Sequence, residues 1–153
     1  MGHIRETIHI DAPLEVCWDI GTDAGRQPEW AEGVLEVKDV TGRLDHVGAG
    51  YTRVFQIAGR HLEARFEVVR VEPLHFMEVA GTTPGGGKAR YTVRNEAAGS
   101  GTDGTFEMEY ELPGGLIGDL ANKLFMERAL ERQMRHSNEN LKALCEAQVP
   151  SRA

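Results

Sequence analysis

The chain has 153 residues, of which 41% are hydrophobic and 27% charged, and its formal net charge at pH 7 is −7. A chain of this length and balance builds a globular core without needing a metal or a disulfide. The negative charge argues against nucleic acid as a partner and disfavours docking on anionic membranes, because both depend on clustered Lys and Arg. No apolar run approaches the roughly 20 residues of a membrane helix, so we expect no stable membrane insertion.

The first thirty residues predict a strand followed by two short helices. Residues 3–10 alternate between apolar and polar side chains, which is the period of a strand. Pro13 suits the start of a helix, and Asp11 is expected to cap it. Glycines then interrupt this helix, and a second short helix is expected to end near Trp30.

The middle of the chain predicts six more strands separated by glycine and proline turns. Ala58-Gly59-Arg60 is expected to form a tight hairpin turn. The cleanest alternation precedes Leu112, where Glu107, Glu109 and Glu111 are expected to face solvent. The expected strands cover residues 34–40, 51–57, 62–71, 76–79, 89–94 and 105–112.

The C-terminal part predicts one long helix. From Leu116 to about Glu146 the only helix-breaking residue is Gly118 in the first turn, so a helix of about 45 Å is possible. The two cysteines, Cys17 and Cys145, lie at opposite ends of the chain. We interpret both as small buried hydrophobic residues rather than as a disulfide.

The opening motif resembles that of a known superfamily. It reads Ile8-x-Ile10-x-Ala12-Pro13, then Trp18 and Asp23, followed by Trp30. Together with the long final helix it is similar to the START-like superfamily, which includes the polyketide cyclases/dehydrases. The resemblance implies an α+β helix-grip fold: a curved antiparallel sheet of about seven strands around a long C-terminal helix, with two short helices after the first strand. It covers nearly the whole chain, as one domain over residues 1–149 and a frayed tail over 150–153.

Proteins of this kind enclose apolar molecules between the sheet and the helix. Flat aromatic side chains and flexible methionine suit such a pocket, although the same residues could also pack into a solid core. The residues expected to line it are Trp30, Tyr51, Arg53, Phe55, Phe66, Tyr91, Phe106, Met108, Tyr110, Leu116, Leu120, Ala121 and Leu124.

Arg53, Tyr91 and Tyr110 are the candidates for chemistry within that set. Arg53 shares the strand face of two aromatic residues, so it points inward if they do, and there it could hold a carboxylate or enolate oxygen. The opposite register would place Val54 inward and Arg53 in solvent. The sequence leaves both registers open.

Three functions remain open at this level. The first is binding of a small apolar or aromatic molecule, lipid-like or polyketide-like. The second is a cofactor-independent, polyketide cyclase/dehydrase-like enzyme that uses Arg53 and a tyrosine to stabilise an enolate. The third is a protein-interaction module. We expect a bacterial protein of the cytoplasm, a monomer or homodimer, with no cofactor and no metal, because no His or Cys pair has ligand spacing.

The turns at Gly59, at 85–87 and at 114–115 could rim the pocket. We predict that they form a mobile gate for ligand entry, and ordinary tight turns are the alternative.

Overall fold

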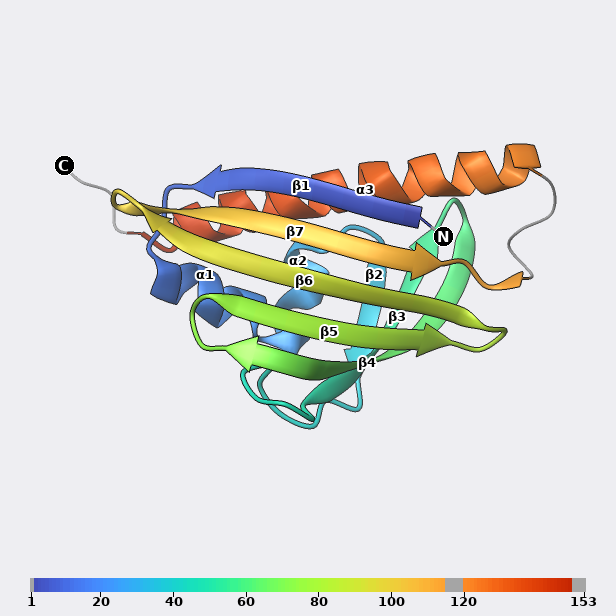
Figure 1. Cartoon of the computed structure of the whole chain (residues 1–153), viewed down its shortest axis with the longest axis horizontal. Coiled ribbons are helices and arrows are strands. Elements are labelled where there is room, and N and C mark those ends of the chain that lie inside the picture. The colour runs from blue at the N-terminus through green and yellow to red at the C-terminus, as the bar shows by residue number, and fades with distance from the viewer. Residues whose placement is uncertain (1, 115–119, 150–153) are drawn as a thin grey trace.

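A computed structural model describes residues 2–114 and 120–149. Within these residues seven strands form one antiparallel sheet in the order β1-β7-β6-β5-β4-β3-β2. The predicted helix-grip fold is confirmed, and Figure 1 shows the curvature of the sheet. The strands are β1 (Gly2–Ile10), β2 (Val34–Lys38), β3 (Gly50–Ile57), β4 (Arg60–Glu72), β5 (Phe76–Thr83), β6 (Gly87–Ala98) and β7 (Gly101–Glu111).

The helices lie together on one side of this sheet (Figure 1). After β1 come α1 (Leu14–Gly21), the short 3-10 helix η1 (Ala24–Arg26) and α2 (Gln27–Trp30). The long helix α3 (Leu120–Ala147) follows β7 and packs against β1, β3, α1 and α2. The predicted first turn of the long helix, from Leu116, and the predicted tail over 150–153 lie outside the described residues.

Two irregularities interrupt the strand pairing and bend the sheet. The register shifts between Val34 and Glu36 in β2, and again between Val68 and Arg70 in β4. An extra residue in one strand increases the local twist and bends that strand. At the second shift Val69 turns outward and is 38% exposed, whereas Val68 stays buried.

The predicted hairpin between β3 and β4 is present. Ile57 pairs with Arg60, so Ala58 and Gly59 form a two-residue turn. Their φ angles are +49° and +80°, as a type I′ turn requires at both central positions. This turn fixes the pairing register of β3, and with it the face on which Arg53 lies.

The prediction that Asp11 caps the first helix is wrong. The residue that precedes α1 is Pro13, in an extended conformation, and no side chain caps the helix. Because the helix begins at Leu14 rather than at Pro13, Asp11 is too early in the chain to reach the free N–H groups. Its carboxylate instead lies 3.0 Å from Nε2 of His9.

A buried glutamine connects α3 to two other parts of the fold. The Gln133 side-chain amide donates to the backbone oxygens of Glu32, at 2.6 Å, and Gln56, at 2.9 Å. Gly33 lies beside it with a φ of +82°, and a Cβ there would lie 1.8 Å from Nε2 of Gln133. The absence of a side chain at Gly33 therefore allows this contact.

We predict that Gly33→Ala lowers the free energy of unfolding by more than about 2 kcal/mol, because the added methyl displaces Gln133 as well as straining the backbone. Gly59→Ala is the matched control: its φ is +80°, but no atom of the described residues lies within 4 Å of the added Cβ. The control is expected to cost only about 1 kcal/mol. Urea unfolding of both variants measures the difference, and equal losses would show that the Gln133 contact adds nothing.

Candidate ligand-binding site

A cavity of about 170 Å³ lies between the sheet and α3. One enclosed water needs only about 10–15 Å³, so the space exceeds what a single water fills. Side chains from all seven described strands and from α1, α2 and α3 line it, and most of the lining is apolar. The residues on the concave face therefore leave space among them instead of forming a solid core.

Many of the residues predicted for a pocket lie around this cavity. Arg53 is among them, so the inward register of β3 is the one that the structure has. The aromatic side chains among these predicted residues come from α2 and from strands β3, β4, β6 and β7, and Trp18 of α1 also lines the cavity. The predicted residues in the lining are Trp30, Arg53, Phe55, Phe66, Tyr91, Phe106, Met108 and Tyr110.

Tyr51 does not line the cavity, contrary to the prediction. It is fully buried behind the lining, and its ring stacks on that of Phe66 with the centroids 5.3 Å apart. Its hydroxyl lies 2.9 Å from the hydroxyl of Tyr91. Tyr51 shares the face of Arg53, but the Phe66 ring covers it, so its role is to support two residues that do reach the cavity.

The prediction also fails for the first turns of α3. Leu120 is 81% exposed and Leu124 is 46% exposed, Ala121 is exposed too, and none of them lines the cavity. A helix turns by about 100° per residue, so Leu124 lies about 160° around the axis from the buried Met126. Leu116, the remaining predicted residue, lies outside the described residues.

The contribution of α3 comes instead from its middle. Its lining residues are Leu130, Gln133, Met134, Ser137, Asn138 and Leu141. The spacing of Leu130, Met134 and Leu141 is a helical stripe that the sequence displays. The sequence gives no sign of which part of a long helix will lie over the hollow of the sheet.

Arg53 is held in place by a residue that no sequence pattern identified. Its Nε and Nη2 donate to Oε1 of Gln27, at 2.9 and 2.6 Å. The guanidinium also lies over the rings of Phe66 and Tyr51, at 5.3 and 5.8 Å from their centroids. Gln27 is on α2 and only 2% exposed, so this amide fixes the direction of the arginine from the helix side.

The positive charge of Arg53 has no carboxylate partner within residues 2–114 and 120–149. A half-buried cation is normally paired, because the charge loses its hydration. Here only a neutral amide and two ring faces stabilise it. The arrangement leaves the guanidinium able to bind an anionic oxygen in the cavity.

Two further polar atoms of the lining residues have no partner among the residues that the structure describes. Nε1 of Trp30 and Oγ1 of Thr83 are buried, and neither makes a hydrogen bond within residues 2–114 and 120–149. Buried polar groups without partners are rare, and each one needs an explanation. Both residues contribute to the wall of the same cavity, at the end of α2 and at the end of β5.

The two cavity tyrosines are both kept protonated. Burial raises the pKa of the Tyr91 phenol well above its usual value near 10, and the nearby Tyr51 phenol adds to this, while the charge of Arg53 opposes it. Burial, with Glu127 and Glu131 of α3, raises the pKa of Tyr110 to about 12. At neutral pH each can donate a hydrogen bond, and neither serves as a base.

The glycine turns of the predicted gate differ in their relation to the cavity. Gly87 lines the cavity, whereas Gly59 does not. The N–H of Gly114 donates to the oxygen of Gly85, at 3.4 Å, which connects the β5–β6 turn to the end of β7. Gly115 lies outside the described residues, and movement of these turns stays a prediction.

Among the described residues, no group of three or more His, Cys, Asp or Glu side chains is arranged to hold a metal ion. The helices of the described part of the chain are too short or too polar to cross a membrane.

Comparison with known proteins identifies the family. Residues 1–146 match the family described as polyketide cyclase / dehydrase and lipid transport, and the chain belongs to it. A comparison with curated proteins finds no match.

Solved structures share the fold at low sequence identity. Protein TTHA0849 from Thermus thermophilus has a TM-score of 0.79 at 19% identity, covering 97% of this chain and 100% of that one. The Zhui aromatase/cyclase from Streptomyces sp. R1128 has a TM-score of 0.77 at 14% identity, covering 98% and 96%. Ginseng major latex-like protein 151 from Panax ginseng has a TM-score of 0.66 at 15% identity, covering 94% and 96%.

We predict that Tyr91 stays protonated at pH 10, where a free tyrosine is about half ionised. The pKa in the folded state lies above that in the unfolded chain, so the stability contributed by burying the neutral phenol is present below about pH 10 and is lost as the pH rises further. The phenolate absorbance of the wild type and of Tyr91→Phe is titrated with pH, and the difference between the two curves reports the ionisation of Tyr91. A midpoint near pH 10 in this difference curve would contradict the prediction.

Proposed function

We propose that this protein binds a flat apolar or aromatic molecule that carries an acidic oxygen, with that oxygen against Arg53. The observation that carries the proposal is a guanidinium in the wall of an apolar cavity, with no carboxylate partner among the described residues. Apolar walls supply most of the affinity of such sites, and a few fixed polar groups determine which ligand fits. Charge-assisted hydrogen bonds to a carboxylate or an enolate are the strongest that arginine makes.

The unpartnered atoms of Trp30 and Thr83 support the same proposal. An indole N–H only donates, whereas a threonine hydroxyl both donates and accepts. A ligand with oxygen atoms near each of them would satisfy the two groups, which have no partner in the described part of the chain. We therefore favour a ligand with several oxygens over a plain hydrocarbon chain, and we expect binding to take place in the cytoplasm.

A second candidate function is polyketide cyclase-like catalysis. Arg53 lies close enough to Tyr91 for its charge to lower the pKa of that phenol. Arg53 would stabilise the enolate that forms when a poly-keto chain folds, and Tyr91 would donate a hydrogen bond to a neighbouring oxygen. Within the described part of the cavity wall neither tyrosine acts as a base, so catalysis would rest mainly on positioning of the chain.

We predict that Arg53→Met weakens binding of 8-anilinonaphthalene-1-sulfonate roughly 10- to 100-fold, as expected for a lost hydrogen bond to a charged group. N-phenyl-1-naphthylamine has the same rings without the sulfonate, and its affinity is expected to change by less than about threefold. Fluorescence titration measures both.

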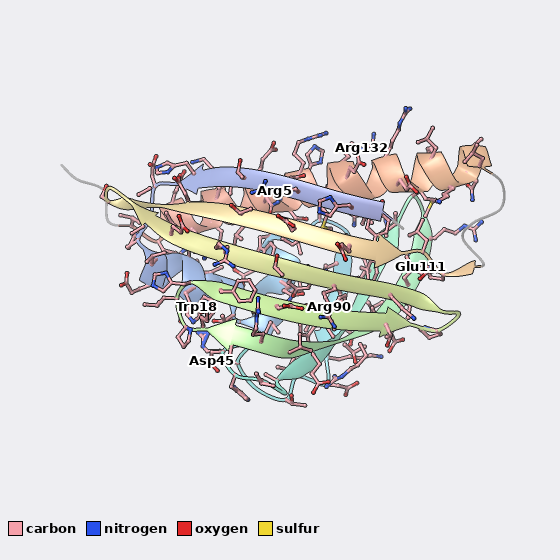
Figure 2. The ribbon with its side chains drawn as sticks, in the orientation of Figure 1. Arg5, Trp18, Asp45, Arg90, Glu111 and Arg132 are labelled. Carbon is pink, nitrogen blue, oxygen red and sulfur yellow. The ribbon has the colours of Figure 1, made fainter. Side chains whose placement is uncertain are left out.

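Arg90→Met is the matched control for that titration. Figure 2 shows Arg90 on the face of the sheet opposite the helices, where it forms an ion pair with Glu78 at 2.6 Å. The Arg90→Met substitution removes one positive charge, as Arg53→Met does. It therefore measures how much the change in net charge alone affects binding of the anionic probe. An equal loss of affinity for the anionic probe in Arg53→Met and Arg90→Met would contradict the proposal. Unchanged affinity in both variants would also contradict it.

The cyclase candidate predicts turnover as well as binding. With a linear poly-β-keto thioester, the wild type is expected to accelerate aromatic ring formation at least about tenfold, and Arg53→Met and Tyr91→Phe are expected to lose most of this. Absorbance of the aromatic product follows the reaction, with Arg90→Met as the control. If the thioester binds but aromatic rings form no faster than without protein, the result supports binding as the function and contradicts catalysis.

A further inference from the structure

The two cysteines, far apart in sequence, are neighbours in the fold. Cys17 is on α1 and Cys145 is near the end of α3, and both are free thiols. They belong to one apolar cluster with Ile10, Ala12 and Ile20. Figure 1 shows α1 at the same end of the molecule as the C-terminal end of α3. Their separation in the sequence therefore does not prevent them from reacting with each other.

The surroundings of the two thiols differ. Cys17 is 5% exposed and lines the cavity, whereas Cys145 is 0% exposed and does not. The Cys17 thiol points to the backbone oxygen of Ala12, at 3.8 Å, and the hydroxyl of Thr102 donates to that same oxygen at 2.8 Å. A small solute in the cavity can therefore contact Cys17, whereas Cys145 lies behind the lining.

The two thiols also differ in pKa. The neighbouring Cys145 thiol lowers the pKa of Cys17 to about 7, with help from Thr102 and against the effect of burial. The Cys17 thiol, together with burial, raises the pKa of Cys145. Glu146 raises the pKa of both thiols, and Arg26 lowers that of Cys145. Cys17 is therefore the nucleophile near neutral pH, because the thiolate is the reactive form.

We propose that Cys17, in the wall of the cavity, and Cys145, buried behind it, form a peroxide-reactive dithiol site. Cys17 reacts first with the peroxide, and Cys145 then reacts with the oxidised Cys17 to form a disulfide. The Cys17 thiolate attacks one oxygen of hydrogen peroxide, the O–O bond breaks, and the leaving hydroxide takes up a proton to become water. Cys145 then attacks the resulting sulfenic sulfur, the S–S bond forms, and the S–OH oxygen leaves as water with the proton of Cys145. Two thiols give up two electrons, and one peroxide becomes two waters.

Hydrogen peroxide fits this site because it is about the size of water, and the cavity exceeds what one water fills. The disulfide would close a loop of almost the whole chain, which constrains the unfolded state strongly. It would also tie α1, part of the cavity wall, to the end of α3. We therefore expect a higher melting temperature for the oxidised protein.

The test uses the reduced full-length chain and dilute hydrogen peroxide, with no ligand, so it is decided separately from the proposed function. Intact mass spectrometry is expected to show the loss of two hydrogens per chain, and a non-reducing peptide map is expected to join the peptides of Cys17 and Cys145. The rate is expected to rise with pH through about 7. A chain that keeps both thiols, or gains oxygen without the cross-link, overturns the proposal.

Two serine variants test the order of the steps. Cys145→Ser is expected to stop at a sulfenic acid on Cys17, which dimedone labels. Cys17→Ser is expected to leave Cys145 unlabelled, because that thiol is buried away from the cavity. Labelling of Cys145 in the second variant, or no labelling of Cys17 in the first, overturns the assignment of roles. The wild-type experiment remains decisive if either variant fails to fold.

Discussion

The curvature of the sheet leaves its concave side too wide for α3 to fill alone. The register shifts in β2 and β4 bend these two strands. The helix α3 packs chiefly along β1 and contacts β3 at a buried amide. The short helices α1 and α2 close part of the remaining space, and what they do not fill is the cavity. The space for the candidate site follows from this mismatch between the curved sheet and the helices that cover it.

Arg53 illustrates how such a space becomes selective. Its neighbours are the neutral amide of Gln27 and two ring faces, which orient the guanidinium without cancelling its charge. A carboxylate in place of Gln27 would have satisfied the arginine internally and made it structural. Because surroundings of low polarity strengthen electrostatic interactions, a single unpaired cation can determine which apolar molecules bind.

The last turns of α3 lie against the end of β1, next to α1. Lys142 donates to the backbone oxygen of His9 at 2.9 Å, and the carboxylate of Glu146 accepts from the N–H of Asp11 at 2.8 Å. These contacts hold the last turns of α3 against β1 and bring Cys145 to Cys17. The proposed peroxide chemistry therefore depends on the same closure that completes the wall of the cavity.

The sequence by itself determined the elements and most of their inward faces. Alternation in β4 and β7, the turn at Ala58 and Gly59, and the apolar stripe of α3 are local patterns, because strand and helix periods depend on neighbouring residues. For β3 the sequence left two registers open. The structure has the register in which Arg53 faces the cavity.

Only the tertiary structure decided which parts of these elements meet. It placed Leu130 rather than Leu120 at the cavity and covered Tyr51 with Phe66. It also set Gln27 against Arg53 and placed Cys17 and Cys145 in one apolar cluster. Contacts between elements depend on how a helix is rotated and shifted against the sheet. That placement is set by the packing of the whole core, and no short stretch of sequence encodes it.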